Sequence, residues 1–359
     1  MKICFYFPFL SNPQNNAIFG GMYRSFFEEL ENLRIEVTFT TLLEEIKGDI
    51  LVTNIGGGWE KQAAKAMTIF NGPVILYVYN AYLNFNRLFL KRWHSRILFA
   101  YNPDYAKLNF EKYKSVNIPY FDFPFGSDEK IFYPFACKKK YDISFLGNAN
   151  SGSGRDKYIK ELIDYVCKNN LNVFLAGAGW DKYGFPYRII THGKDTNTLY
   201  NESKVCINIH NDRQYLGIDK EMDANNRLFD LAMAGCCQVS NGEQMISRYF
   251  EKDEIATADN ADEWIKKIDF YLKNEKERDK RGENARNRAL KEHTWNARAK
   301  YFIQLINQQL PDYSSRSQKV SLFNSLFRCI DRKLPPLYLM KEIRIIRFTL
   351  IKLKLYNKK

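Results

Sequence analysis

The sequence has no C-x-x-C pair, although it contains seven cysteines among its 359 residues. The cysteines stand at positions 4, 137, 167, 206, 236, 237 and 329. An odd number of cysteines without paired spacing argues against a disulfide framework and against a zinc site. This pattern indicates a reducing compartment, and we expect the protein in the cytoplasm.

Long uncharged hydrophobic runs are also missing. The N-terminal stretch MKICFYFPFLSNPQNN has only a short apolar run and no small-residue cleavage site. A run of this length is too short to span a bilayer, and it lacks the pattern of a secretory signal. We therefore expect it to form a first buried strand.

The positive charge is concentrated at one end of the chain. The formal net charge is +13, and residues 311–359 hold twelve Lys or Arg against three Asp or Glu, a net +9. On a helix, Lys341, Arg344, Arg347, Lys352 and Lys354 fall within an arc of about 160°. Basic and bulky apolar residues together favour an interfacial helix on an anionic membrane surface over residues 312–359. The alternative is a C-terminal helix that packs on the body of the protein.

Strand and helix signals alternate along the body. Short runs rich in β-branched and aromatic residues are KICFYFPFL, IEVTFT, DILVTNI, PVILYVYN and ILFAYN, followed later by YDISFLG, NVFLAGAG, RIITHG, VCINIH, CQVSN and EIATA. Amphipathic stretches lie between them, including 261–274, 275–292 and a helix from about 294 that Pro311 is expected to end. Apolar runs that do not alternate with polar residues are typical of strands covered on both faces. The pattern predicts an α/β protein with two doubly wound, Rossmann-like parallel sheets.

The alternation pauses over 118–140, which holds three prolines, a glycine and a basic triplet. We interpret this stretch as the crossing between two domains. The expected ranges are 1–133 for an acceptor-side domain, 134–293 for a nucleotide-sugar-side domain, 294–310 for a returning helix and 311–359 for the basic tail. Doubly wound sheets bind ligands at the carboxyl ends of their strands, so a cleft between the two domains is the expected site.

Residues 225–236, NNRLFDLAMAGC, combine a buried helix face with polar groups at the helix start. Asn225, Arg227 and Asp230 place an amide, a guanidinium and a carboxylate within two turns. A helix N-terminus favours an anion, an arginine adds a forked contact to phosphate, and a carboxylate accepts hydrogen bonds from sugar hydroxyls. The alternative is an ordinary amphipathic helix whose polar residues only cap and solvate it.

The second half of the chain resembles the GT-B glycosyltransferases, in particular the group named for the spore maturation protein CgeB. The matching pieces, in the family's order, are YDISFLGNANSGSGRDKY, FLAGAGW, LYNESKVCINIH, NNRLFDLAMAGC, DEWIKKIDFYL and KEHTWNARAKYF. The first half matches more loosely, through IFGGMYRSFFEEL and FPFGSDEKIFYPF. The resemblance implies two facing Rossmann-like domains and a nucleotide-sugar donor.

The resemblance assigns the helix at 225 to the donor site, because N-x-R-x-F-E matches Asn225, Arg227, Phe229 and Asp230. It also implies donor contacts from Gly147, Asn148 and Arg155 of the glycine-rich loop, from Gly179, and from the double glycine Gly20 and Gly21. His192, Gly193, Asn208 and His210 end strands at the same rim. Structural alternatives are a surface turn for the loop, a left-handed turn for the double glycine and a structural role for His210. Where retaining members carry a first acid this chain has Met222, so the stereochemistry stays open.

The catalytic residues implied are Asp230, Arg227 and His210, with Asp104 as a candidate base at the rim. Asp104 could equally be a helix cap. Tyr79 and Asn80 stand where related enzymes carry a base, and neither is one. His94 and His293 are expected on helix surfaces. No metal-ligand spacing is visible, so we expect no metal and no cofactor besides the nucleotide sugar, whose base is unknown.

These observations predict a metal-independent, hexosyltransferase-type GT-B glycosyltransferase on the inner face of a membrane. The expected acceptor is a glycan, lipid-linked because of the tail, in surface polysaccharide or lipopolysaccharide biosynthesis. One alternative is a catalytically silent GT-B module that binds glycan or scaffolds a partner enzyme. Another is a basic nucleic-acid-binding protein, which the confinement of the charge to the tail and the lack of a recognition motif disfavour, so no nucleic-acid partner is expected.

Overall fold

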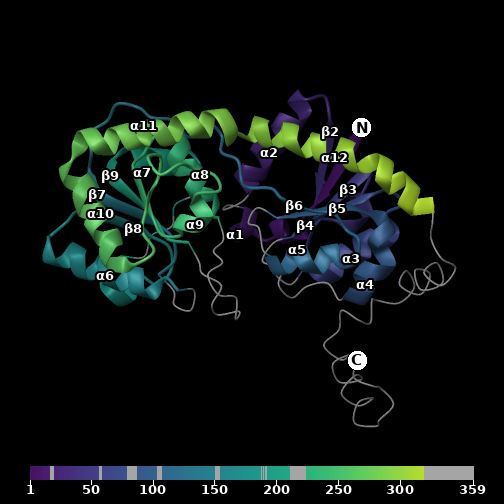
Figure 1. The fold of residues 1–359 in the computed structure, drawn as a ribbon, viewed down its shortest axis with the longest axis horizontal. Helices are drawn as coiled ribbons and strands as arrows, with labels where there is room; N and C mark the ends of the chain where they lie inside the picture. The colour runs from purple at the N-terminus through teal and green to yellow at the C-terminus, as the bar shows by residue number, and fades with distance from the viewer. Residues whose placement is uncertain are drawn as a thin grey trace, which may run out of the picture. The chain divides into compact units, whose positions relative to one another are not determined.

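The computed structural model describes residues 1–16, 20–55, 59–78, 87–102, 107–149, 154–186, 188, 190, 192–210 and 224–318. The chain forms two compact units. Unit 1 consists of Met1–Asn15, Leu30–Phe123 and Tyr301–Lys359, and unit 2 consists of Asn16–Glu29 and Pro124–Lys300. Each unit is built on one parallel sheet (Figure 1), which confirms the predicted fold class.

The sheet of unit 1 has six strands in the order β2-β1-β3-β4-β5-β6. Their bounds are Lys2–Tyr6 (β1), Glu36–Thr40 (β2), Ile50–Ile55 (β3), Val74–Val78 (β4), Ile97–Asn102 (β5) and Tyr120–Asp122 (β6). All neighbouring strands are parallel. The first five agree with the predicted strands, whereas β6 lies inside the stretch that we interpreted as a crossing.

Helices cover both faces of this sheet (Figure 1). They are α1 (Pro13–Asn15), α3 (Glu60–Ile69), α4 (Arg87–Trp93), α5 (Lys107–Lys114) and the last part of α12 (Trp295–Gln318). Side chains of β1 alternate between the faces: Cys4 and Tyr6 join the core under α3, α4 and α5. Phe5 points the other way, and its ring lies 6.2 Å from that of Phe302 in α12. Two buried faces explain why the strands read as unbroken apolar runs.

The sheet of unit 2 has five strands in the order β11-β10-β9-β7-β8. The bounds are Tyr141–Leu146 (β7), Val173–Ala176 (β8), Ser203–Asn208 (β9), Gln238–Ser240 (β10) and Ala256–Thr257 (β11). The predicted strand RIITHG is wrong as a sheet strand: of its described residues, Arg188 makes only an isolated antiparallel bridge with Gly177.

The helices of unit 2 also lie on both faces of its sheet (Figure 1). They are α6 (Asp156–Lys168), α7 (Lys194–Asn201), α8 (Asn226–Met233), α9 (Glu243–Ile246), α10 (Ala261–Lys273) and α11 (Glu275–Glu292). In β9, Val205 and Ile207 pack in the core with α6 and α10. Cys206 between them packs with α8, α9 and α11. The helices predicted over 261–274 and 275–292 agree with α10 and α11.

Helix α12 begins where Thr294 caps it, since the Thr294 hydroxyl accepts a hydrogen bond from the Ala297 amide at 3.1 Å. The expectation that Pro311 ends this helix is wrong, because α12 continues through Pro311 to Gln318. Pro311 is exposed, so water can solvate the carbonyl that its missing N–H leaves without a partner. None of the described helices is long and apolar enough to cross a membrane. The predicted membrane-associating tail lies outside the described residues from 319 onward.

Residues 16–29, which contain most of α2 (Gly21–Asn32), pack with unit 2 rather than with the sheet that precedes them. The Ser25 hydroxyl donates to the Asp128 carboxylate at 2.7 Å, and the Asn296 amide donates to the Glu29 carboxylate at 2.7 Å. The four sequence ranges given above stay predictions. The packing adds the finding that an N-terminal helix belongs largely to the second unit.

Helices α8 and α11 approach each other closely at two glycines. Gly235 ends α8 in the left-handed region with φ +69°, as expected for a helix C-terminus. On α11, a Cβ atom at Gly282 would lie only 2.2 Å from the Gly235 carbonyl oxygen. Arg286, one turn further along α11, donates to the Met233 carbonyl and so caps the last turn of α8.

Replacing Gly282 by alanine tests this contact. Glycine-to-alanine changes within helices usually stabilise a protein by about 0.5–1 kcal/mol. Here we expect the opposite, a loss of about 1–3 kcal/mol, because the added methyl group must displace backbone rather than a flexible side chain. Urea denaturation measures the change, with Glu283→Ala at an exposed position of the same helix as control. A higher midpoint for Gly282→Ala would contradict the packing.

Candidate functional site

Helix α8 has an N-cap residue, Asn225, whose side chain bonds to the first turn. The Asn225 side chain accepts a hydrogen bond from the Leu228 amide at 3.1 Å, which satisfies one free donor of the first turn. The Asn225 amide nitrogen donates to Asn208 at 2.9 Å, at the carboxyl end of β9. Asn225 therefore fixes the helix start to the sheet edge, and its predicted contact with a donor stays a prediction.

Asn208 is the centre of a buried polar network at this edge. Its amide nitrogen donates to Gln238 on β10 at 2.9 Å and contacts Nε2 of His210 at 3.1 Å. Its carbonyl oxygen accepts from Nη1 of Arg227 at 3.0 Å. Asn208, His210 and Gln238 are completely buried. The network thus brings together Asn208, His210, Asn225 and Arg227, four of the residues predicted for the site.

Two members of this network were not predicted. Gln238 contacts Asn208, and Asn241 accepts from the His210 backbone amide at 2.7 Å and donates back to its carbonyl at 3.2 Å. Both side chains are buried. Their signal in the sequence is CQVSN, a run read as a strand, in which two amides interrupt the apolar residues. Buried amides of this kind need partners, and here they hold the site together.

Arg227 and Arg155 place two positive charges at the carboxyl ends of the unit 2 strands. Burial and, to a smaller extent, the positive charge of Arg227 together lower the pKa of Arg155 to about 10. Burial also lowers the pKa of Arg227, which Asp230 partly offsets. The pKa of His210 is well below its ordinary value, mainly because the imidazole is buried and also because the charges of Arg227 and Arg155 oppose its protonation. The surroundings thus disfavour a third positive charge, and they suit a bound anion.

Gly147, which follows β7 and begins the glycine-rich loop, lets the Arg227 side chain approach the backbone of that loop. A Cβ atom at Gly147 would lie 3.1 Å from a terminal nitrogen of Arg227, whose guanidinium stacks 5.0 Å above the Phe145 ring. Arg155 stands directly before α6, and its Nη1 points toward the Asn148 carbonyl at 3.4 Å. The structure therefore brings Gly147, Asn148 and Arg155 together with Arg227, while residues 150–153 of the loop lie outside the described residues.

Asp230 is buried in α8, and both of its carboxylate oxygens have partners. Oδ1 accepts a hydrogen bond from the Ser127 hydroxyl at 2.7 Å, and Oδ2 contacts Nε2 of His192 at 2.9 Å. Oδ2 also accepts from the Asn226 amide at 3.4 Å. Oδ1 can accept a second hydrogen bond, so the arrangement keeps capacity for a ligand hydroxyl. Ser127, which lies 103 residues from Asp230 in the chain, was not predicted, and no local pattern marks it.

His192 forms an ion pair with Asp230 when it is protonated. Burial alone lowers the pKa of His192, but the Asp230 carboxylate outweighs burial, so the pKa is raised above its ordinary value. Gly193 follows with φ +138°, a backbone conformation that favours glycine, and precedes α7. The predicted pair His192–Gly193 thus lies at the site, where the His192 side chain contacts the Asp230 carboxylate.

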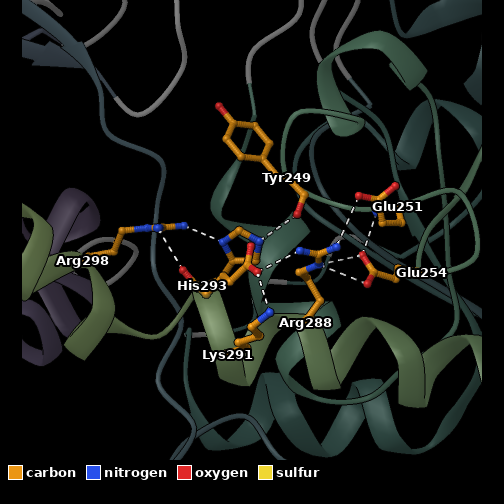
Figure 2. Close-up of polar contacts among 8 residues, drawn as sticks. Tyr249, Glu251, Glu254, Arg288, Lys291, His293 and Arg298 are labelled. Atoms are coloured by element: carbon orange, nitrogen blue, oxygen red, sulfur yellow. Dashed lines mark hydrogen bonds and ion pairs between the residues drawn. The ribbon is translucent and has the colours of Figure 1, made fainter.

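Ser127 is itself held by the start of α12. The Ser127 amide donates to the His293 carbonyl at 2.9 Å, and the Trp295 amide donates to the Ser127 carbonyl at 3.2 Å. Figure 2 shows the His293 imidazole between Arg298 and the Tyr249 carbonyl. Nδ1 of His293 accepts from Arg298 at 2.6 Å, so Nε2 carries the proton that faces Tyr249 at 3.0 Å.

The expected helix-surface position of His293 is therefore wrong, because its side chain is buried among Phe229, Phe250 and Arg298. Burial, together with the charge of Arg298, lowers the pKa of His293 to about 4. The imidazole is neutral at physiological pH. Beside it, Arg288 pairs with Glu251, Glu254 and Glu292 (Figure 2), which ties α11 to the segment after α9.

Other predicted residues are not part of this network of contacts. Gly20 and Gly21 stand at the start of α2, and Gly179 has φ +87° in the loop after β8. Asp104, Tyr79, Asn80 and Met222 lie outside the described residues. In the described part of the chain, no group of three or more His, Cys, Asp or Glu is arranged to hold a metal ion.

Residues 155–304 match the protein family described as "Glycosyl transferase-like". The match begins at Arg155 and includes α8 and the start of α12, so it covers most of the site described above. No curated protein matches the chain.

Solved structures share the fold at low sequence identity. The β-glucosyltransferase of phage T4, in complex with UDP-glucose, aligns with a TM-score of 0.57 and 13% identity over 85% of this chain and 99% of that one. HepE of Anabaena, in complex with UDP, aligns with a TM-score of 0.56 and 11% identity over 86% and 100%. TarM aligns with a TM-score of 0.53 and 11% identity over 72% of this chain, and the chain spans only about half of TarM, 54%.

These structures establish the two-domain fold, and the family match supplies the class. The protein is a glycosyltransferase with the GT-B fold. Its glycosyl transferase-like segment, residues 155–304, lies almost entirely within unit 2. The predicted resemblance and the predicted GT-B glycosyltransferase class are confirmed, and the hexosyltransferase type and metal independence stay predictions.

The charge of Arg155 predicts opposite effects of its removal on stability and on ligand affinity. In the part of the chain that the structure describes, no carboxylate contributes to the pKa of Arg155, so Arg155→Met removes a desolvated positive charge near Arg227. We expect the ligand-free protein to become more stable by up to about 1 kcal/mol, because an apolar side chain replaces an uncompensated cation. UDP should bind roughly ten- to a hundredfold more weakly, because a charge-assisted contact is lost.

Thermal unfolding and calorimetric titration with UDP measure the two effects. Lys157→Met, at an exposed position in the first turn of α6, is the control and should change neither. A variant that loses stability and keeps full UDP affinity would show that Arg155 has a structural role instead.

His293 generates a pH prediction. Unfolded histidine titrates near 6.5, whereas folded His293 titrates near 4, so the unfolded state binds more protons between these values. Stability is therefore complete above pH 6.5 and falls as the pH drops, by about 2–3 kcal/mol at pH 4.5. Urea denaturation at several pH values should show a smaller acid loss for His293→Gln than for the wild type. The same slope in both proteins, or an equal change for the control His94→Gln, would contradict the buried neutral imidazole.

Proposed function

We propose that the protein transfers a sugar from a UDP-sugar to a glycan acceptor. The observation that carries the donor is the Arg155–Arg227 pair, two partly buried cations whose electrostatic repulsion a diphosphate would relieve. Solved proteins of this fold were crystallised with UDP or UDP-glucose, which supports uridine as the base. Asn225 and the start of α8 then frame the phosphates, with Gly147 allowing backbone to approach.

Asp230 and His192 have a separate role in this proposal. Oδ1 of Asp230 accepts only from Ser127 among the described residues, and its remaining acceptor position suits a hydroxyl of the ribose or of the transferred sugar. Ser127 and His192 fix the carboxylate, so its geometry is set before the donor arrives. Leaving-group charge would be stabilised by the two arginines, with no metal ion in the proposal.

The acceptor is proposed from the sequence alone. The solved proteins of this fold differ here, because the T4 enzyme is described as DNA-modifying and TarM was crystallised with α-GlcNAc-glycerol. We propose a lipid-linked glycan of a surface polysaccharide or lipopolysaccharide, because the basic and apolar tail favours a protein on the inner face of a membrane. The silent-module alternative predicts donor binding without turnover.

Donor hydrolysis and UDP binding test the proposed function. Arg227→Met and Asp230→Asn should each lower affinity for UDP or UDP-sugar by roughly ten- to a hundredfold, because each removes a charge-assisted contact. Hydrolysis of the correct UDP-sugar by the wild type should persist in excess chelator. Arg248→Met, an exposed arginine outside the site, is the matched control.

Affinity for UDP equal to the wild type in both site variants would remove this donor assignment. Binding without any hydrolysis or transfer, across UDP-sugars and acceptors, would favour the silent module. Complete loss in chelator that Mg²⁺ reverses would place a metal in the reaction.

A further inference from the structure

Residues 133–140, here called the strap, connect Phe132 to β7 without regular secondary structure and belong to unit 2. The backbone of the strap is held by two buried asparagines of α7. Asn197 accepts from the Tyr133 amide at 3.2 Å and donates to the Tyr133 carbonyl at 3.1 Å. Asn201 accepts from the Phe135 amide at 3.0 Å and also donates to the Tyr133 carbonyl at 3.1 Å. Two side-chain amides thus take the place of a neighbouring strand.

The far end of the strap is fastened to the same helix end. The Lys139 ammonium donates to the Asn201 carbonyl at 2.7 Å, and the Lys140 amide donates to the Glu202 carbonyl at 2.7 Å. The Lys140 side chain pairs with the Glu202 carboxylate at 2.5 Å. The strap is therefore anchored through its backbone at Tyr133, Phe135 and Lys140, and through the side chain of Lys139.

The side chains that the strap presents are aromatic and exposed. Tyr133 is 43% exposed and Phe135 is 39% exposed, and their ring centroids lie 6.2 Å apart. Phe132, one residue earlier, turns inward and packs against His192 and Tyr200. Single exposed aromatics are ordinary, but two neighbouring rings on a rigid, solvent-facing segment mark a surface for a partner.

Three lysines follow the two aromatic residues in the sequence. Lys138, Lys139 and Lys140 are all exposed, and Glu202 is the acid that pairs with Lys140. Aromatic rings with a polar or wet edge favour the interface between lipid and water, and lysines favour anionic head groups. Lys139 donates to the Asn201 carbonyl and Lys140 pairs with Glu202, so the exposed Lys138 is the lysine most available to a head group. A neutral glycan would use the rings but would gain nothing from this charge.

We propose that the strap is a docking surface for an anionic lipid bilayer, with Tyr133 and Phe135 at head-group level and Lys138 next to lipid phosphates. This surface goes beyond the proposed function, because it requires neither a donor nor turnover. It is also separate from the tail, which lies outside the described residues. An acidic protein partner is the competing occupant and is an outcome of the test.

A cysteine already stands in the strap and serves as a local probe. Cys137 and Cys167 are the exposed cysteines of the described residues, and Cys167 lies on α6. Cys167→Ser with Cys329→Ser leaves Cys137 for an environment-sensitive fluorophore. Cys137→Ser with Cys329→Ser leaves Cys167 as the matched control. Both are full-length proteins, so the tail is present in each.

With vesicles containing phosphatidylglycerol, the label at Cys137 should shift to the blue and be quenched by lipid-borne quenchers, and the label at Cys167 should do neither. Phosphatidylcholine vesicles should give no shift. The pair Tyr133→Ser and Phe135→Ser should reduce the affinity behind the Cys137 signal by about tenfold. Lys138→Glu should reduce it by about fivefold or more. Phe270→Ser, at an exposed aromatic of α10, should leave it unchanged.

Three results would overturn the proposal: no Cys137 shift although the protein pellets with anionic vesicles, equal shifts at Cys137 and Cys167, or a shift with polyglutamate but not with vesicles. The last would assign the strap to an acidic protein partner. UDP affinity should be the same in all strap variants, so failure here and failure of the donor site are distinguishable.

Discussion

The site depends on one electrostatic constraint: among the described residues, two arginines share the carboxyl ends of the unit 2 strands without enough negative charge between them. Arg227 has Asp230 nearby, whereas no carboxylate of the described residues contributes to the pKa of Arg155. Natural cores rarely keep an uncompensated desolvated charge, because its cost in stability is large. A site that keeps one is prepared for an anion that arrives later. The neutral imidazole of His210 and the amides around Asn208 follow from the same constraint, since they add hydrogen bonds without adding charge.

A second set of contacts connects Asp230 to two segments of unit 2, the one around Ser127 and the start of α12. Ser127 holds Asp230, and its backbone pairs with that around Thr294, where α12 starts. Arg298 reinforces this junction by donating to His293 and to the Phe125 carbonyl at 3.2 Å. The carboxylate proposed to contact sugar hydroxyls is thus positioned by residues far away in the sequence. A substitution at His293, Trp295 or Arg298 would therefore alter the proposed donor site by displacing Ser127, without a change in α8 itself.

Sequence patterns predicted the fold well where signals were local and strong. Unbroken apolar runs predicted ten of the strands, and caps with regular periodicity predicted α8, α10 and α11. Predictions failed where context overrides a local rule: an exposed proline stays inside α12, and β6 is a three-residue strand beside prolines. In the site, the residues on one helix or one strand end were predicted together. Ser127 and the burial of His293 were not, because they follow from packing between distant segments that no local spacing records.

The most direct test of this account is a crystal structure of the protein with UDP. The account predicts the diphosphate within hydrogen-bond distance of both the Arg155 and Arg227 guanidinium groups, with a ribose hydroxyl near the Asp230 carboxylate. UDP bound away from these residues, or a diphosphate that contacts neither arginine, would contradict the central claim.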